Sequence, residues 1–449
     1  FHRVKGTGSG FTEPCAYAEL LGYEVIESIT ATDKYTVVFK LKEDVTGKTF
    51  YLGYNIAQVI AASYYSDIYP PEVIEEHGDA KDWRTIVGTG PFMLTDYVLE
   101  SSITLERNPN YWGNDPKYPE NRLPYIDEMR VLYMLEPATF ISALRTGKVD
   151  WIGLLHRSAI KSIDHVESLM RTNPEIVLTK VWSRSNNSFG FSLNKEPFDD
   201  LRVRQAMQMA LDHETINNTY FKGYGNWVPQ GRLSSDMTGY TTPFAEWPEE
   251  VKKYWTYDPE GAEALLDAAG LPRGADGIRF KTVLNSRVLK DISYHELASG
   301  YWREIGIQVE IRTVDLAAEK AMRESGLFEG FWTSAMAMRK DALGQYALLY
   351  SKSEPLRWTG IADPVYDALY EAAEAASTGS EEQKRLGREM GLREAEMHWF
   401  IWGTESPQFS ANWPWLKGYN GETALGYGES IWLFAYLWID QDLKAAMGH

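Results

Sequence analysis

Residues 87–112 read VGTGPFMLTDYVLESSITLERNPNYW, and residues 124–151 read PYIDEMRVLYMLEPATFISALRTGKVDW. Gly88 and Gly90 can adopt positive φ angles and Pro91 has a fixed φ, so this stretch begins with a turn. Beyond the turn, apolar and polar residues alternate in two separate runs, which is the pattern of strands with one buried face. The stretch therefore predicts a turn, two strands and then a helix.

The first alternating run places Ile103 and Leu105 on one face of a strand, and residues 107–112 follow as a polar turn with two aromatic side chains. The second run predicts a strand whose shared face consists of Met129, Val131, Tyr133 and Leu135. Pro137 suits the first position of a helix, and Gly147 ends that helix. The apolar face of the helix consists of Phe140, Ile141 and Leu144.

Other segments give similar local signals. Residues 35–41 alternate as a strand after a turn at 33–34. Side chains suited to cap the first turn of a helix are Asp199 or Asp200, Asp258, Asp363 and Ser380. The helix after Asp200 carries an apolar stripe formed by Val203, Met207, Ala210 and Leu211. Strands that alternate with helices of about ten or more residues indicate an α/β fold.

Taken in order, GTGPF at 88–92, LERNPNYW at 105–112 and LRTGKVD at 144–150 resemble the solute-binding proteins of ATP-driven importers. The type that they resemble is the large oligopeptide and dipeptide type, solute-binding family 5. The block NKEPFDDLRVRQAMQMALDHETI at 194–216 and the YDP helix start at 257–259 resemble further blocks of the same family. The ordered set is a stronger signal than any one of its parts.

The resemblance covers most of residues 24–445 and implies a two-lobe α/β fold, the type II periplasmic-binding-protein fold with an extra subdomain. It implies that residues 1–187 and 413–449 form lobe I and that residues 188–412 form lobe II. Family members carry a long stretch before the equivalent of Gly22. We therefore expect the N-terminal part of lobe I to be absent from this chain, or to exist as a separate fragment.

Composition excludes several classes of protein. The chain has 449 residues, too many for a single core, and is 44% hydrophobic and 24% charged, as in ordinary globular proteins. No apolar run approaches the roughly 18 residues that a membrane helix needs. The net charge of -18 argues against nucleic acid as a partner. Cys15 is the single cysteine, so the chain contains no internal disulfide.

The sequence contains none of the common catalytic or metal-binding motifs. No two of the eight histidines are three or four positions apart, and HExxH, GxSxG, Walker and CxxC motifs are missing from the sequence. Adjacent acids such as Asp199 and Asp200 suit helix caps or polar faces. The sequence therefore predicts a binding protein that is not an enzyme and has neither a metal nor a cofactor.

In the resembled family the ligand lies between two lobes that are joined by crossing strands. The resemblance places the passage to lobe II at 182–193 and the return near 410–415. The candidate ligand contacts near these crossings are Trp182, Asn186, Trp413 and Trp415. For the tryptophans the alternative is plain packing inside the protein.

Residues 331–341 correspond to a second ligand-facing segment of the family and supply the candidates Trp332, Ser334, Met338, Arg339 and Asp341. In peptide-binding members the first Asp of this segment holds the amino group of the peptide, and here that position falls on Met338. Asp341 falls on the second acid. A buried ammonium group without a carboxylate is costly, so this departure weakens the peptide assignment. The alternative for Arg339 and Asp341 is that they pair with each other or face solvent.

The resemblance implies a periplasmic or other extracytoplasmic receptor, secreted or membrane-anchored through a missing N-terminus. Its role would be to capture a solute and deliver it to the membrane permease of an ABC importer. A peptide is the leading ligand. An oligosaccharide is the alternative, because sugar rings stack on indole faces, and other small solutes such as nickel chelates or opines follow. More distant alternatives are a chaperone-like peptide holder and an enzyme on the same scaffold.

Overall fold

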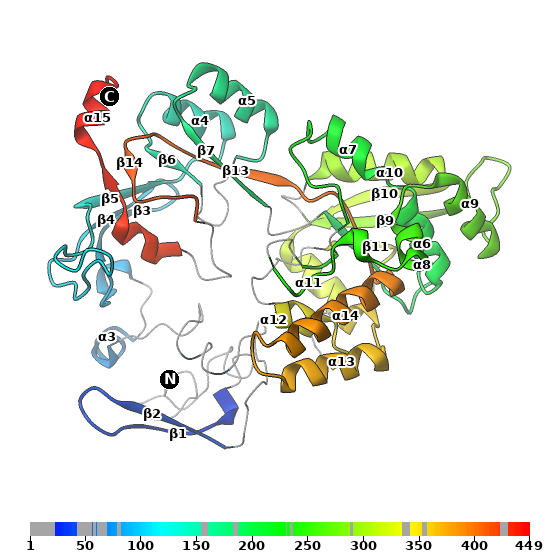
Figure 1. Cartoon of the computed structure of the whole chain (residues 1–449), viewed down its shortest axis with the longest axis horizontal. Coiled ribbons are helices and arrows are strands. Elements are labelled where there is room, and N and C mark those ends of the chain that lie inside the picture. Colours follow the sequence, from blue (N-terminus) through cyan, green and yellow to red (C-terminus); the bar gives the residue numbers. More distant parts are fainter. Residues whose placement is uncertain are drawn as a thin grey trace. The chain divides into compact units, whose positions relative to one another are not determined.

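The computed structural model describes residues 23–42, 56, 60, 70–78, 82–153, 160–182, 187–229, 231–233, 237–287, 291–334, 342–352, 357–422 and 430–449 (Figure 1). The chain divides into two compact units. Unit 1 combines Phe1–Lys40, Ala57–Val181 and Gln408–His449, and unit 2 combines Leu41–Ile56 with Trp182–Pro407. The limits of the ligand-binding lobes, 1–187, 188–412 and 413–449, stay a prediction, because these units record only which segments pack together.

The strands of unit 1 form four small sheets, with the orders β1-β2, β3-β4-β5, β6-β13-β7 and β14-β15. The strands are β1 (Ile26–Ala31), β2 (Val37–Leu41), β3 (Phe92–Val98), β4 (Ser102–Arg107), β5 (Glu128–Leu132), β6 (Trp151–Ile152), β7 (Val177–Trp182), β13 (Pro407–Asn412), β14 (Leu416–Lys417) and β15 (Trp438–Ile439). The helices are α3 (Pro71–His77), α4 (Pro137–Arg145), α5 (Ile163–Thr172) and α15 (Gln441–Ala446).

The two strands and the helix predicted within residues 87–150 are confirmed by β4, β5 and α4, but β3, which precedes β4 and pairs with it, was not predicted. Leu105 lies opposite Met129, and Ile103 lies opposite Val131, so these side chains share one face of the sheet. The predicted second strand was too long, because β5 ends at Leu132. Tyr133 and Leu135 lie beyond it and are exposed, since the chain already turns there toward α4.

Helix α4 begins at Pro137 as predicted and buries Ile141 and Leu144. Gly147 follows its C-terminal end with a φ of 67°, a conformation that a side chain would strain. The local signals of this segment were therefore sufficient to predict both ends of the helix.

Unit 2 is built on a five-stranded sheet with the order β10-β9-β11-β8-β12. Its strands are β8 (Ser188–Gly190), β9 (Phe280–Arg287), β10 (Ile307–Val314), β11 (Phe331–Ser334) and β12 (Phe400–Trp402). Strands β10, β9 and β11 are parallel, and β8 is antiparallel to both β11 and β12. Gly330, directly before β11, has a φ of 73°, and a Cβ atom there would overlap with the backbone of Val283.

The helices of unit 2 are α6 (Leu201–Met209), α7 (His213–Thr219), α8 (Glu249–Lys252), α9 (Pro259–Ala268), α10 (Ile292–Glu304), α11 (Leu316–Ser325), α12 (Ala342–Tyr346), α13 (Pro364–Ala375) and α14 (Glu381–Met397). The predicted caps are confirmed. In each case the side-chain oxygen of the capping residue accepts a hydrogen bond from a backbone N–H in the first turn. The capping residues are Asp200, Asp258, Asp363 and Ser380.

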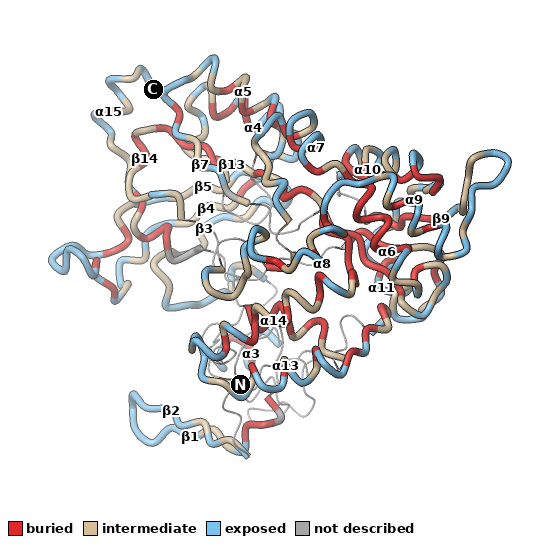
Figure 2. The backbone as a smooth tube through the Cα atoms, turned by 45° about the vertical axis from the view of Figure 1, so that its right-hand side comes forward, coloured by how far each residue is buried: buried red, intermediate tan, exposed pale blue. Residues whose placement is uncertain are grey.

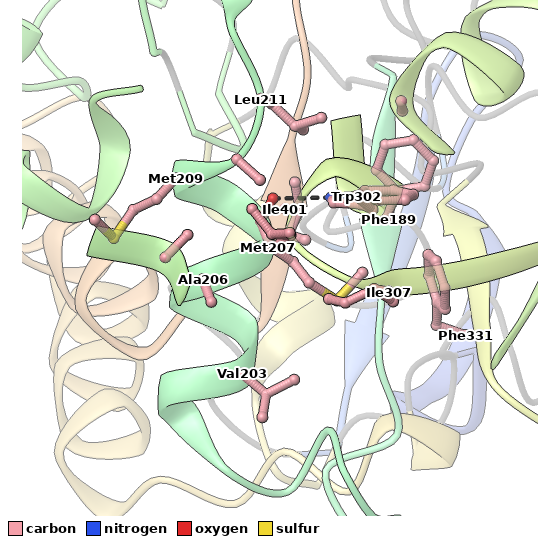
Figure 3. Close-up of a cluster of buried hydrophobic side chains, with 14 of the residues drawn as sticks. Phe189, Val203, Ala206, Met207, Met209, Leu211, Trp302, Ile307, Phe331 and Ile401 are labelled. Atoms are coloured by element: carbon pink, nitrogen blue, oxygen red, sulfur yellow. Dashed lines mark hydrogen bonds between the residues drawn. The ribbon is translucent and has the colours of Figure 1, made fainter. Parts of the chain in front are cut away.

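The core of unit 2 lies between α6 and the sheet. Helix α6 and strand β9 are buried along most of their length (Figure 2). Figure 3 shows the predicted stripe residues Val203, Met207 and Leu211 together with Trp302 and Phe331. The indole Nε1 of Trp302 donates a hydrogen bond of 2.9 Å to the carbonyl of Met207, which joins α10 to α6.

Strand β12 is an outer strand of this sheet. The side chain of Gln208 forms hydrogen bonds with backbone groups on its unpaired side. The backbone N–H of Trp402 donates to Gln208 Oε1 over 3.0 Å, and Gln208 Nε2 donates to the Trp402 carbonyl over 3.3 Å. Gln208 thus makes the two hydrogen bonds that a neighbouring strand would make. An edge satisfied in this way is a poor template for pairing with another chain.

Two fully enclosed histidines make the stability of unit 2 dependent on pH. Burial lowers the pKa of His213 and of His398 from 6.5 to about 4. Between these values the unfolded chain binds protons that the folded chain does not. The free energy of unfolding should therefore fall below pH 6.5, by about 1.4 kcal/mol per pH unit for each histidine.

Urea denaturation between pH 7 and pH 5 tests this expectation. His213→Gln and His398→Asn should each flatten the dependence, and Asn is the replacement at 398 because His398 has a φ of 45°, which Asn tolerates. An unchanged slope in both variants would contradict the assignment.

Candidate functional site

The parallel strands of unit 2 all end on the same side of the sheet, and we call this side its carboxyl edge. Open α/β sheets bind their ligands at this edge. Strand β9 ends at Arg287, β10 at Val314 and β11 at Ser334. Five side chains gather at this edge, and we call them the edge cluster: Arg287, Glu319, Arg323, Trp332 and Trp358.

Glu319 is the centre of the edge cluster. Asp315 caps α11 by accepting a hydrogen bond of 2.8 Å from the Ala318 N–H, which places Glu319 in the first turn of the helix. Its carboxylate is 2.6 Å from Arg287 Nε and 2.9 Å from Arg323 Nη1. The Glu319 side chain is only 4% exposed, so the carboxylate needs both partners to offset its lost hydration.

Arg323 lies between two indole rings. The centre of its guanidinium group is 4.8 Å from the ring of Trp332 and 4.8 Å from the ring of Trp358, distances at which a cation is attracted to an aromatic face. Nη2 also donates to the Thr333 carbonyl over 3.3 Å. Burial lowers the pKa of Arg323 to about 10, and the neighbouring Glu319 opposes that shift. Arg323 therefore stays charged at neutral pH.

Three buried donors of the edge cluster have no hydrogen-bond partner in the part of the chain that the structure describes. They are Nε1 of Trp332, Nε1 of Trp358 and Nε of Arg323. Buried donors in proteins are almost always satisfied, so donors left open at the ligand-binding edge of a sheet are suited to a bound acceptor.

The structure places two of the sequence-predicted residues, Trp332 and Ser334, at this edge. Trp332 belongs to the edge cluster and is fully buried, and Ser334 ends β11 opposite Ser188 of β8. Trp182 is half-buried at the end of β7. The remaining candidates of these two segments lie outside the described residues: Asn186, Met338, Arg339 and Asp341. Their roles stay predictions.

Trp413 and Trp415 lie inside unit 1. Their rings stack 4.4 Å apart with an angle of 6° between the planes, and both are almost completely buried. Trp413 Nε1 donates to the Leu144 carbonyl and Trp415 Nε1 to Asp150 Oδ1, each over 2.7 Å. These contacts are the ones expected if both tryptophans pack inside the protein, and they leave no ring face exposed. Ligand contact at either residue stays a prediction.

Four residues of the edge cluster were not predicted from the sequence: Arg287, Glu319, Arg323 and Trp358. The spacing of Glu319 and Arg323, four residues apart on one helix, is a readable signal for an ion pair. Trp358 gives no such signal, because it lies in a short 3₁₀ turn, Arg357–Thr359, far from its partners in the chain. Within the described residues no group of His, Cys, Asp and Glu could hold a metal ion, and no helix there is long and apolar enough to cross a membrane.

The chain is similar in sequence to curated binding proteins. The chain is 24% identical to the dipeptide-binding protein of Escherichia coli over 325 residues, which are 70% of this chain and 53% of that protein. It is 24% identical to heme-binding protein A of Haemophilus influenzae over 309 residues, 68% of this chain and 50% of that protein. The chain thus spans about half the length of the curated relatives that it matches.

Solved structures share the fold. The periplasmic binding protein DppA of Helicobacter pylori, in complex with the peptide STSA, superimposes with a TM-score of 0.68 at 21% identity, covering 95% of this chain and 78% of that one. These neighbours confirm the predicted two-lobe α/β binding-protein fold. The model for bacterial extracellular solute-binding proteins, family 5 Middle, matches residues 2–355, most of the sequence. The chain belongs to solute-binding family 5.

Proposed function

We propose that this protein is an extracytoplasmic receptor that binds a peptide and delivers it to the membrane permease of an ABC importer. Family membership supports the receptor role, and the names of the dipeptide-binding relative and of the peptide-bound structural neighbour support the ligand class. Because the chain spans about half the length of its curated relatives, the ligand and the transport role of the whole protein are part of this proposal.

The observation that carries the peptide assignment is the charge of the edge cluster. Arg287 and Arg323 supply two positive charges, and Glu319 supplies one negative charge. One positive charge is therefore unbalanced within the cluster. This charge, with the two indole N–H groups beside it that have no hydrogen-bond partner among the described residues, is suited to binding a carboxylate. Every unblocked peptide carries a carboxylate at its C-terminus, whereas a neutral sugar does not.

The same geometry disfavours the oligosaccharide alternative at this edge. Sugar binding uses the open face of an aromatic ring. Here one face of both Trp332 and Trp358 is already stacked on Arg323, and Trp332 is fully buried. The proposal keeps Trp182, Asn186, Ser334, Met338, Arg339 and Asp341 as further ligand contacts.

Peptides with a free C-terminus should bind more tightly than the same peptides with a C-terminal amide. Losing the charged partner of a buried arginine costs roughly 2–5 kcal/mol. Isothermal titration of a set of di- to pentapeptides, each in acid and amide form, measures the difference. Equal affinities for acid and amide would refute the role of the edge cluster, and binding of neutral oligosaccharides alone would refute the peptide assignment.

Replacing Glu319 by Gln should destabilise unit 2, because two partly buried arginines lose their shared carboxylate. We expect the free energy of unfolding to fall by about 3 kcal/mol in urea denaturation. Glu324→Gln, on the same helix, is the matched control. The Glu324 side chain is 65% exposed, and its replacement should change stability by less than about 0.5 kcal/mol. Similar losses in both variants would show that Glu319 is not the centre of the cluster.

A further inference from the structure

Unit 1 contains a groove of its own, separate from the edge cluster. Its volume is about 1110 Å³, and it is lined by residues between 115 and 128 and between 418 and 441. All of these residues belong to unit 1, and none was predicted from the sequence to bind ligand. The volume is slightly above the range of about 300–1,000 Å³ that is usual for small-molecule sites.

The lining of the groove is strongly acidic. Its acidic residues are Asp115, Asp127, Glu128 and Glu422, whereas Lys117 is the single basic residue among the lining residues. Asp127 is 3.1 Å from Arg107, and the carboxylate of Glu422 accepts hydrogen bonds from Asn420. Arg107 offsets the charge of Asp127, whereas the neutral Asn420 leaves the charge of Glu422 in place.

Glu128 has an unusual position for a carboxylate. It is the first residue of β5 and lies directly opposite Glu106 of β4. Like charges at opposing positions of a sheet are unfavourable. Neither carboxylate has an ion-pair or hydrogen-bond partner within the described residues. A cation bound in the groove beside Glu128 would relieve this repulsion.

Aromatic side chains form the rest of the wall. They are Tyr118, Tyr125, Tyr436 and Trp438. Trp438 is 44% exposed and Tyr118 is 47% exposed, so both offer open ring surface. Lys117 Nζ lies 5.6 Å from the ring centre of Tyr118, within the range of a cation–π contact, so Trp438 is the ring that a bound cation would meet.

The wall is held in place by a buried carboxylate. Asp115 Oδ2 accepts a hydrogen bond of 2.7 Å from the Tyr125 hydroxyl, and Oδ1 accepts from the Lys117 and Tyr118 N–H groups over 2.7 and 3.2 Å. These bonds, with Tyr125 contributing most, lower the pKa of Asp115. The loop that carries Tyr118 is therefore fixed before any ligand arrives.

We propose that this groove is a second binding site, which takes an organic cation with an ammonium or guanidinium group and an apolar stem. The charged group pairs with Glu128, and the stem lies on the open face of Trp438. The proposal does not rest on the peptide-receptor function, because it uses residues of unit 1 alone.

Isothermal titration with spermidine and agmatine tests the site. We expect one cation per chain, and Glu128→Gln or Trp438→Ala should each weaken binding by about fivefold or more. The matched controls are Glu72→Gln on α3 and Trp112→Ala, because neither residue lines the groove and Trp112 is 78% exposed, and both variants should bind as the original protein does. Circular dichroism checks that each variant is folded.

A second titration identifies the kind of molecule that supplies the cation. An Ala-Arg-Ala peptide with both ends blocked separates the sources of the cation. If it competes with spermidine, a peptide side chain can supply the charged group, and if it does not, a free amine is required. No binding of either amine up to about 10 mM would overturn the proposal, and so would binding that is equal in the Glu128→Gln, Trp438→Ala and control variants.

Discussion

One buried guanidinium group joins two segments of unit 2 that lie far apart in the sequence. Arg204 of α6 is 3% exposed, and its nitrogens donate to the carbonyls of Phe198, Asp199, Met397 and His398 over 2.7–3.1 Å. Burial lowers its pKa to about 10, whereas the carboxylates of Asp200 and Asp199 raise it, so the group remains charged at neutral pH. Because the partners lie 193 and 194 positions away as well as 5 and 6, this interaction places the end of α14 beside the start of α6. Strand β12 follows directly from that junction.

The edge cluster depends on this scaffold through the sheet. Strand β8 pairs with β12 on one side and with β11 on the other, so the position of β12 constrains the position of β11. Gly330 allows β11 to run close to Val283 of β9, which a side chain would prevent. Phe331 then enters the core, and Trp332 takes its place beside Arg323. The chemistry of the candidate site is therefore set by packing that begins at α6, well away from it.

Local interactions were predictable from sequence, and long-range ones were not. The caps Asp258 and Ser380 and the helix end at Gly147 depend on neighbours within about four residues, so the sequence shows them directly. Family resemblance supplied the fold and placed Trp332 in a functional segment. Neither approach gave the stacking of Trp358 on Arg323 or the four carbonyl contacts of Arg204, because such contacts depend on how distant segments dock. The stacking of Trp413 on Trp415 was invisible for the same reason.

The hydrogen bond between Gln208 and strand β12 gives the backbone amide of Trp402 a special use. Its exchange rate reports how the contact between α6 and β12 opens. The Trp402 N–H is held by Gln208 of α6 and not by a neighbouring strand, so its exchange with solvent deuterium requires the contact between Gln208 and β12 to break. Amides inside the β8–β12 ladder exchange only when the sheet itself opens. Comparing the two rates tells whether the helix undocks before the sheet unravels or whether both open as one cooperative unit.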